Sequence, residues 1–115
     1  MTQQEIQERN EQIALMLGWK NLNDKSFPEY IDTVGNFYPL KELKFHSDWN
    51  WLMEGYNYIT KHHDIAWKIT SKGVEIHNHG QGIDIWYETN CPKNVIKDAF
   101  LALSDFAKLY NEGKL

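Results

Sequence analysis

Three segments of the chain repeat apolar residues at the three- and four-residue spacing of an amphipathic helix. They are residues 3–17, 48–60 and 92–111. Thr2 stands just before the first segment with Glu5 three residues on, which is the pattern of a capping box. The last segment has the widest apolar face, and we expect it to lie along a sheet.

The segment 48–60 has apolar residues on two of its faces. One stripe consists of Trp49, Leu52, Met53 and Tyr56. Trp51 and Tyr58 lie off that stripe, seven residues apart, and share a second face. We favour a helix that is buried on two sides, and the alternative is an aromatic patch that binds a partner or ligand.

Residues 64–88 alternate between apolar and polar positions, as a half-buried strand does. Turn residues at 71–73 and 80–81 divide them into three strands, which predicts an antiparallel meander. With those turns, Lys68 faces Glu75, and Glu75 faces Trp86 on the third strand. The same register pairs Ala66 and Asp84 with His77, and Asp64 with His79.

Alternation then assigns each side chain of the meander to one face of the sheet. The core face carries Trp67, Ile69, Val74, Ile76, Ile85 and Tyr87. The polar face carries Asp64, Lys68, Glu75, His77, His79, Asp84, Trp86 and Glu88. Trp86 is the one large aromatic residue on that polar face, so we expect it to meet water, a ligand or a second chain.

Residues 18–46 contain many turn-forming residues between scattered aromatic ones. We interpret them as a long connection, with the option of a fourth short strand from residues 34–45. The predicted fold class is therefore α+β. The meander packs with three helices as a two- or three-layer sandwich, in a single domain over residues 1–115.

Composition narrows the class of protein further. The chain is 42% hydrophobic and 14% aromatic, which supplies enough apolar surface for a core. A formal charge of −4 argues against binding to a nucleic acid polymer. No apolar run approaches the roughly 20 residues of a membrane span. The single Cys91 cannot form a disulfide within the chain and fits a reducing cytoplasm.

The strongest candidate for chemistry is the alternating pair His77 and His79, which would share one strand face. Together with Asp84 they offer the ligand types that zinc accepts. The predicted pairs His77–Asp84 and His79–Asp64 account for the same residues as ordinary polar contacts, and we favour that interpretation over a metal site. Because the chain has no catalytic or cofactor-binding motif, we expect neither an enzyme nor a bound cofactor.

Three segments carry a resemblance to a known family. They are "LMLGWK" at 15–20, "HSDWNWLM" at 46–53 and "FAKLYNE" at 106–112. In these segments, and in the order of its elements, the chain resembles small bacteriophage and prophage proteins of the phage ABA sandwich domain type. The resemblance implies a phage origin, helices on both faces of a sheet, and action in the cytoplasm of the infected bacterial host. It brings no catalytic residues.

Our first functional hypothesis is a small, non-enzymatic accessory protein of a phage. It would act against host defence, by sequestering a nucleotide-derived signal or by blocking a host protein. A ligand ring would stack on an exposed aromatic residue and a lysine would meet its phosphates. The candidate ligand-binding residues are Trp86, Lys68, His77, Trp19, Lys20, Trp51 and Tyr58.

Two other hypotheses stay open. The chain could be a homo-oligomeric structural or protein-interaction module, with Trp51 and Tyr58 or Trp86 as interface anchors. The third hypothesis is a metal-dependent hydrolase that uses His77, His79 and Asp84, and we rank it last.

Overall fold

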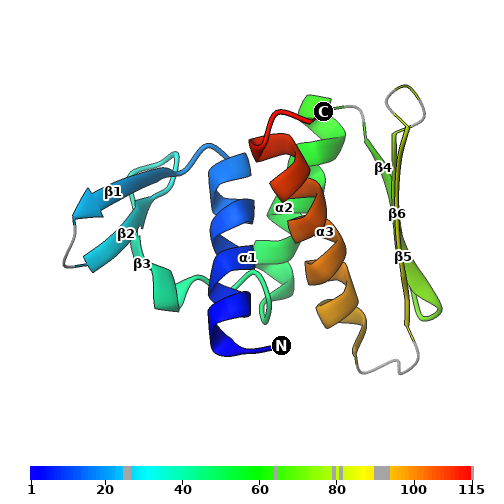
Figure 1. Cartoon of the computed structure of the whole chain (residues 1–115), viewed down its shortest axis with the longest axis horizontal. Coiled ribbons are helices and arrows are strands. Elements are labelled where there is room, and N and C mark those ends of the chain that lie inside the picture. Colours follow the sequence, from blue (N-terminus) through cyan, green and yellow to red (C-terminus); the bar gives the residue numbers. More distant parts are fainter. Residues whose placement is uncertain (25–26, 64, 79, 81, 90–93, 115) are drawn as a thin grey trace.

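Within the residues that the structure describes, three α-helices lie between two three-stranded antiparallel sheets (Figure 1). The computed structural model describes residues 1–24, 27–63, 65–78, 80, 82–89 and 94–114. From one end of the long axis to the other, the layers are the first sheet, α1, the pair α2 and α3, and the second sheet.

The bounds of these elements follow the chain in a simple order. The helices are α1 (Gln3–Met16), α2 (Trp49–His63) and α3 (Val95–Asn111), with a short 3₁₀ helix η1 (Leu40–Glu42). The first sheet contains β1 (Lys20–Asp24), β2 (Phe27–Ile31) and β3 (Phe37–Pro39). The second contains β4 (Ala66–Thr70), β5 (Gly73–Asn78) and β6 (Ile83–Glu88).

Side chains cap the starts of α1 and α2. The Thr2 hydroxyl accepts a hydrogen bond from the Glu5 backbone N–H at 3.1 Å, so the predicted N-cap of α1 is confirmed. Asp48 does the same for α2, accepting from the Asn50 N–H at 2.9 Å. α2 continues to His63, beyond the predicted end at residue 60. The predicted start of the last helix, at residue 92, lies outside the described residues.

The predicted meander is confirmed in strand order and in register. Lys68 faces Glu75, and Glu75 faces Trp86, while His77 lies between Ala66 and Asp84. Val74 and Ile76 are fully buried on the side that faces the helices. The expected pair of Asp64 with His79 and the turn at 80–81 involve positions outside the described residues.

The predicted connection at 18–46 is instead built largely of a second sheet. β1 and β2 pair along their length, and β3 adds to β2 with Tyr38 opposite Tyr30. The optional fourth strand is therefore present as β3, but it pairs with β2 and not with the meander. Asp32 holds a tight hairpin turn between β2 and β3 by accepting backbone hydrogen bonds from Val34 and Asn36 at 3.0 and 2.9 Å.

The centre of the core is α3, which packs on α1, on α2 and on the β4–β6 sheet. Its buried residues are Ala99, Phe100, Ala102, Leu103, Ser104, Phe106 and Ala107. The Tyr56 hydroxyl of α2 donates to the Ala99 carbonyl at 2.6 Å, which ties the two helices inside the core. In the stripe of α2, Leu52 and Tyr56 are buried as expected, but Trp49 is 42% exposed because it lies at the first residue of the helix.

The α+β class predicted from the sequence is confirmed. The order of the layers differs from what the family resemblance implies, because the helices lie between two sheets. No helix of the described part of the chain covers the outer face of the β4–β6 sheet (Figure 1). That face is therefore available for contacts outside the core.

Close packing of α2 on α3 depends on Gly55. A methyl group there would come within 2.5 Å of Leu103 Cδ2, and Leu103 is itself fully buried. Overpacking of this kind destabilises by about 1–3 kcal/mol, against a gain of up to about 1 kcal/mol from the helix propensity of alanine. We expect Gly55→Ala to lower the free energy of unfolding, measured in urea, by about 1 kcal/mol.

Asn57→Ala is the matched control, because Asn57 is exposed on the same helix. It gains up to about 0.7 kcal/mol of helix propensity without a clash, so its stability should equal or exceed that of the wild type. A Gly55→Ala variant as stable as this control would show that α2 and α3 are less closely packed than the structure indicates.

Candidate functional site

The outer face of the β4–β6 sheet presents a large aromatic side chain. Trp86 is 51% exposed, as its place on the polar face predicts. Its indole lies across Gly73 of the neighbouring strand so closely that a methyl group at Gly73 would overlap the ring. Because Gly73 has no side chain, the indole packs directly on the backbone of β5. Lys68 and Lys72 join them around a shallow hollow of about 170 Å³.

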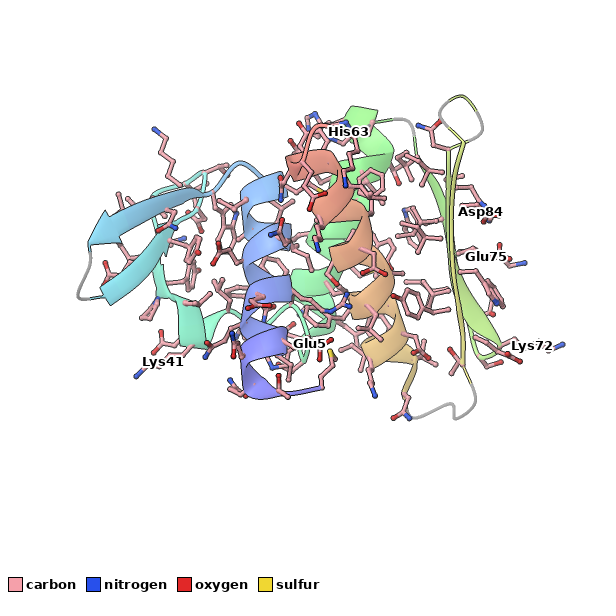
Figure 2. The ribbon with its side chains drawn as sticks, viewed as in Figure 1. Glu5, Lys41, His63, Lys72, Glu75 and Asp84 are labelled. Carbon is pink, nitrogen blue, oxygen red and sulfur yellow. The ribbon has the colours of Figure 1, made fainter. Side chains whose placement is uncertain are left out.

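Charges of both signs surround this tryptophan, and Glu75 lies on the central strand between Lys68 and Trp86. Lys68 on β4 and Lys72 in the turn after it are exposed at one edge of the sheet. Asp84 and Glu88 on β6 are exposed at the other edge. Figure 2 shows Lys72 and Asp84 on the side of the sheet that faces away from the helices. The result is a flat polar face with an aromatic centre.

His77 lies on the same face between two carboxylates. Its Nε2 is 3.1 Å from Glu75 Oε2, and its Nδ1 is 3.1 Å from Asp84 Oδ1. The predicted His77–Asp84 pair is confirmed, and Glu75 contacts His77 in addition to facing Lys68. His79, the other histidine of the expected metal site, is outside the described residues. Among the described residues, no group of three or more His, Cys, Asp or Glu side chains is placed to hold a metal ion.

The other candidate ligand residues lie elsewhere. Trp19 and Trp51, which are 32 positions apart, pack edge to face with ring centroids 5.6 Å apart. Lys20 is exposed and pairs with Ile31 at the start of β1, and it does not line the hollow beside Trp19. Tyr58 lies at a third place, 4.4 Å from the His62 ring. Of the predicted set, Lys68, His77 and Trp86 therefore share the outer face of the β4–β6 sheet, and the other four residues do not join them.

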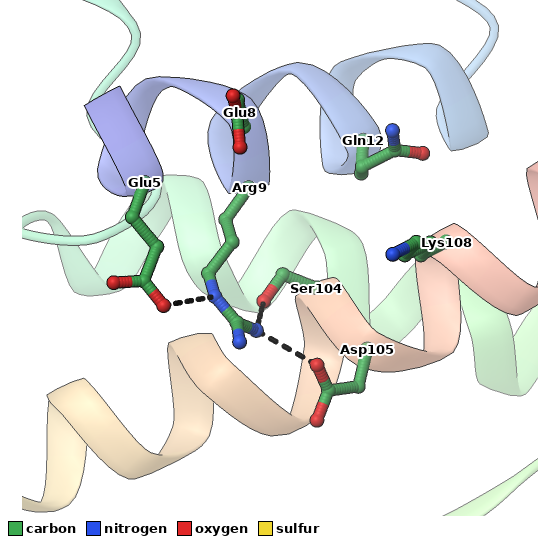
Figure 3. A pocket seen from close by; sticks show the side chains of 7 residues that line it. All are labelled: Glu5, Glu8, Arg9, Gln12, Ser104, Asp105 and Lys108. Atoms are coloured by element: carbon green, nitrogen blue, oxygen red, sulfur yellow. Dashed lines mark hydrogen bonds and ion pairs between the residues drawn. The ribbon is translucent and has the colours of Figure 1, made fainter. Parts of the chain in front are cut away.

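Sequence reasoning missed a polar cluster between α1 and α3. The Arg9 guanidinium donates to Asp105 Oδ1 at 2.7 Å and to the Ser104 hydroxyl at 2.8 Å, beside a hollow of about 340 Å³ (Figure 3). Glu5 lies 3.8 Å from the same guanidinium, and the Tyr87 hydroxyl donates to the other oxygen of Asp105. Ser104 and Asp105 are 95 and 96 positions from Arg9 in the sequence, so no local motif signals the contact between the two helices. Because Arg9 is already neutralised, we interpret this cluster as a structural tie.

Comparisons of the chain with protein-family models, with curated proteins and with solved structures find no match. The site has to be judged on its geometry. None of the helices in the described part of the chain has the length and apolar character that a membrane span requires. On geometry alone, the outer face of the β4–β6 sheet is the best candidate surface.

Tyr87 gives the structural tie a pH dependence. Burial, the hydrogen bond to Asp105 and the charge of Asp105 raise the pKa of Tyr87 to about 12. A tyrosine in the unfolded chain has a pKa of about 10. The unfolded chain therefore loses this proton first. The contribution of Tyr87 to stability is complete below about pH 10 and is lost as the pH rises towards 12.

We expect Tyr87→Phe to make the alkaline loss of stability less steep. The free energy of unfolding is measured in urea between about pH 9 and pH 12. Its decrease per pH unit should be smaller in the variant than in the wild type by up to about 1.4 kcal/mol, which is the limit for the titration of one proton. Tyr110→Phe removes an exposed phenol and should keep the wild-type slope. If the free energy of unfolding falls equally steeply with pH in the two variants, Tyr87 does not titrate as this geometry requires.

Proposed function

We propose that the protein is a non-enzymatic accessory protein of a phage, and that it contacts a host protein through the outer face of the β4–β6 sheet. The observation that carries the proposal is that the Trp86 side chain is half-exposed and packs on the backbone of Gly73. Tryptophan is among the residues that dominate the energy of protein interfaces. An indole already held by the backbone loses little side-chain freedom on binding. The phage origin rests on the family resemblance of three short segments.

The size of the hollow favours a protein over a free nucleotide. Its volume of about 170 Å³ is below the roughly 300–1,000 Å³ of small-molecule pockets. Lys68 and Lys72 beside the Trp86 ring support the alternative, a nucleotide-derived signal whose base stacks while its phosphates meet the lysines. A protein surface needs no enclosed volume and can use the flat face as it stands.

The distribution of charge favours a partner with a complementary pattern. A surface that places carboxylates over Lys68 and Lys72 and cations over Asp84 and Glu88 would be oriented by these pairs. A second copy of this chain, related by a two-fold axis that lies between the two sheet faces and parallel to the strands, presents that pattern. This self-complementarity supports the homo-oligomeric module as the second candidate function.

Trp86→Ala and Trp49→Ala are a matched pair of variants for the test. Both remove an exposed tryptophan, but Trp49 lies on α2, away from the proposed surface. Tagged wild type and both variants would be incubated with extract of a bacterial host, and the proteins retained would be identified by mass spectrometry. A specific partner should be retained by the wild type and by Trp49→Ala, and lost by Trp86→Ala.

The purified partner then gives the quantitative result. Loss of a tryptophan hot spot costs about 2 kcal/mol or more, so the Kd should rise about 30-fold for Trp86→Ala and stay within about twofold for Trp49→Ala. A dimer that only Trp86→Ala dissociates would favour the homo-oligomer. A small phosphate-bearing molecule retained in native mass spectrometry, and lost in Lys68→Ala, would favour the nucleotide. If the Trp86→Ala variant differs from Trp49→Ala in none of these measurements, the proposed surface is wrong.

A further inference from the structure

A further hollow lies where α2 meets the turn between β2 and β3. Its volume is about 310 Å³, at the lower end of the roughly 300–1,000 Å³ of small-molecule pockets. The residues that matter for its chemistry are Trp19, Tyr38, Trp51, Asp32 and Glu54. It is distinct from the surface around Trp86 and is built from other elements.

The wall of this hollow is a packed aromatic cluster. Trp19 and Tyr38 stack with ring centroids 5.4 Å apart and an interplanar angle of 20°. Trp51 meets both edge to face, at 5.6 Å from Trp19 and 5.0 Å from Tyr38. Trp19 is only 8% exposed, and it holds the rings of Tyr38 and Trp51 in place. Tyr38 and Trp51 are partly buried and supply most of the aromatic surface of the hollow. Rings held in this way form a preorganised surface for a ligand.

The charge of the hollow is negative. The ionisable residues that line it are Asp32 and Glu54, and the described lining contains no Lys, Arg or His. The oxygens of Asp32 accept hydrogen bonds from Val34 and Asn36 in its own turn. Glu54 is exposed on α2 and is one of the residues that line the hollow. A phosphate would be repelled here, and Lys20, which we expected to meet one, does not line this hollow.

The aromatic wall already accepts a cation from the chain itself. The Lys44 ammonium lies 5.3 Å from the centroid of the Trp51 ring and 3.6 Å from Asp48 Oδ2. Lys44 does not line the hollow, so this contact leaves the hollow free. The Trp51 ring thus takes a cation in the presence of a nearby carboxylate, which is the combination that the hollow also offers.

From this combination we propose that the hollow binds a small organic cation. The ligand is an ammonium, quaternary ammonium or guanidinium group on a compact apolar body. Tyr38 and Trp51 contact the apolar body and the face of the charge, and Glu54 supplies the opposite charge. The site is independent of the surface around Trp86, so either can be present without the other.

Choline and its uncharged isostere 3,3-dimethyl-1-butanol separate a cation site from a merely apolar one. Each would be titrated into the ¹⁵N-labelled full chain while the assigned indole N–H signals are followed by NMR. Choline should shift the signals of Trp19 and Trp51 and leave that of Trp86 in place. The isostere has the same shape without the charge, so it should bind about tenfold more weakly.

Glu54→Gln tests the charge without removing packing, because Glu54 is exposed. It should weaken choline binding several-fold, while Glu88→Gln, an exposed change on the other sheet, should leave it unchanged. Equal binding of choline and the isostere would overturn the proposal. So would a failure of choline, tetramethylammonium and agmatine alike to shift the Trp19 and Trp51 signals, or a Glu54→Gln variant that binds choline as the wild type does.

Discussion

The packing of α3 against α1, α2, β5 and β6 is the constraint on which the rest of the structure depends. A helix can be surrounded in this way only if small residues let its neighbours approach. The small residues of α3 are Ala99, Ala102 and Ala107, which are all fully buried, and α2 has Gly55 where it packs on α3. Because α3 occupies the middle of the molecule, the β4–β6 sheet packs one face on it and turns the other face outward. The available surfaces thus follow from the position of one helix.

The polar tie beneath the sheet determines which side chains face outward. Tyr87 turns inward and donates to Asp105, which also accepts from Arg9 of α1. Since neighbouring residues on a strand point to opposite faces, the inward position of the partly buried Tyr87 places Trp86 on the outside. A slip of β6 by one residue would bury Trp86 and break the contact with Asp105. The half-exposed tryptophan is therefore a consequence of the same hydrogen bonds that join three layers.

Much of this arrangement could be predicted where local rules are strong. Strict alternation and the turn residues gave the register of β4–β6 and the outward position of Trp86. The β1–β3 sheet was not predicted, because its strands are short and contain Asn, Asp and Pro, which normally indicate turns. Its pairing is decided by tertiary contacts, such as Tyr38 stacked on Trp19. The aromatic hollow could not be predicted either, because Trp19, Tyr38 and Trp51 are far apart in the sequence and no local pattern links them.

The two candidate sites differ in their chemistry because they lie on opposite sides of the helical layer (Figure 1). The β4–β6 face is flat, carries both signs of charge and has one exposed ring, which suits a large partner. The hollow at α2 and the β2–β3 turn is concave, with several packed rings and an acidic rim, which suits a small cation. The helices between them keep both sites away from each other's charges, since exposed charges farther apart than about 8–10 Å are largely screened at physiological ionic strength. A ligand in the hollow would therefore leave the sheet face free, and one chain could hold a small cation while it contacts another protein.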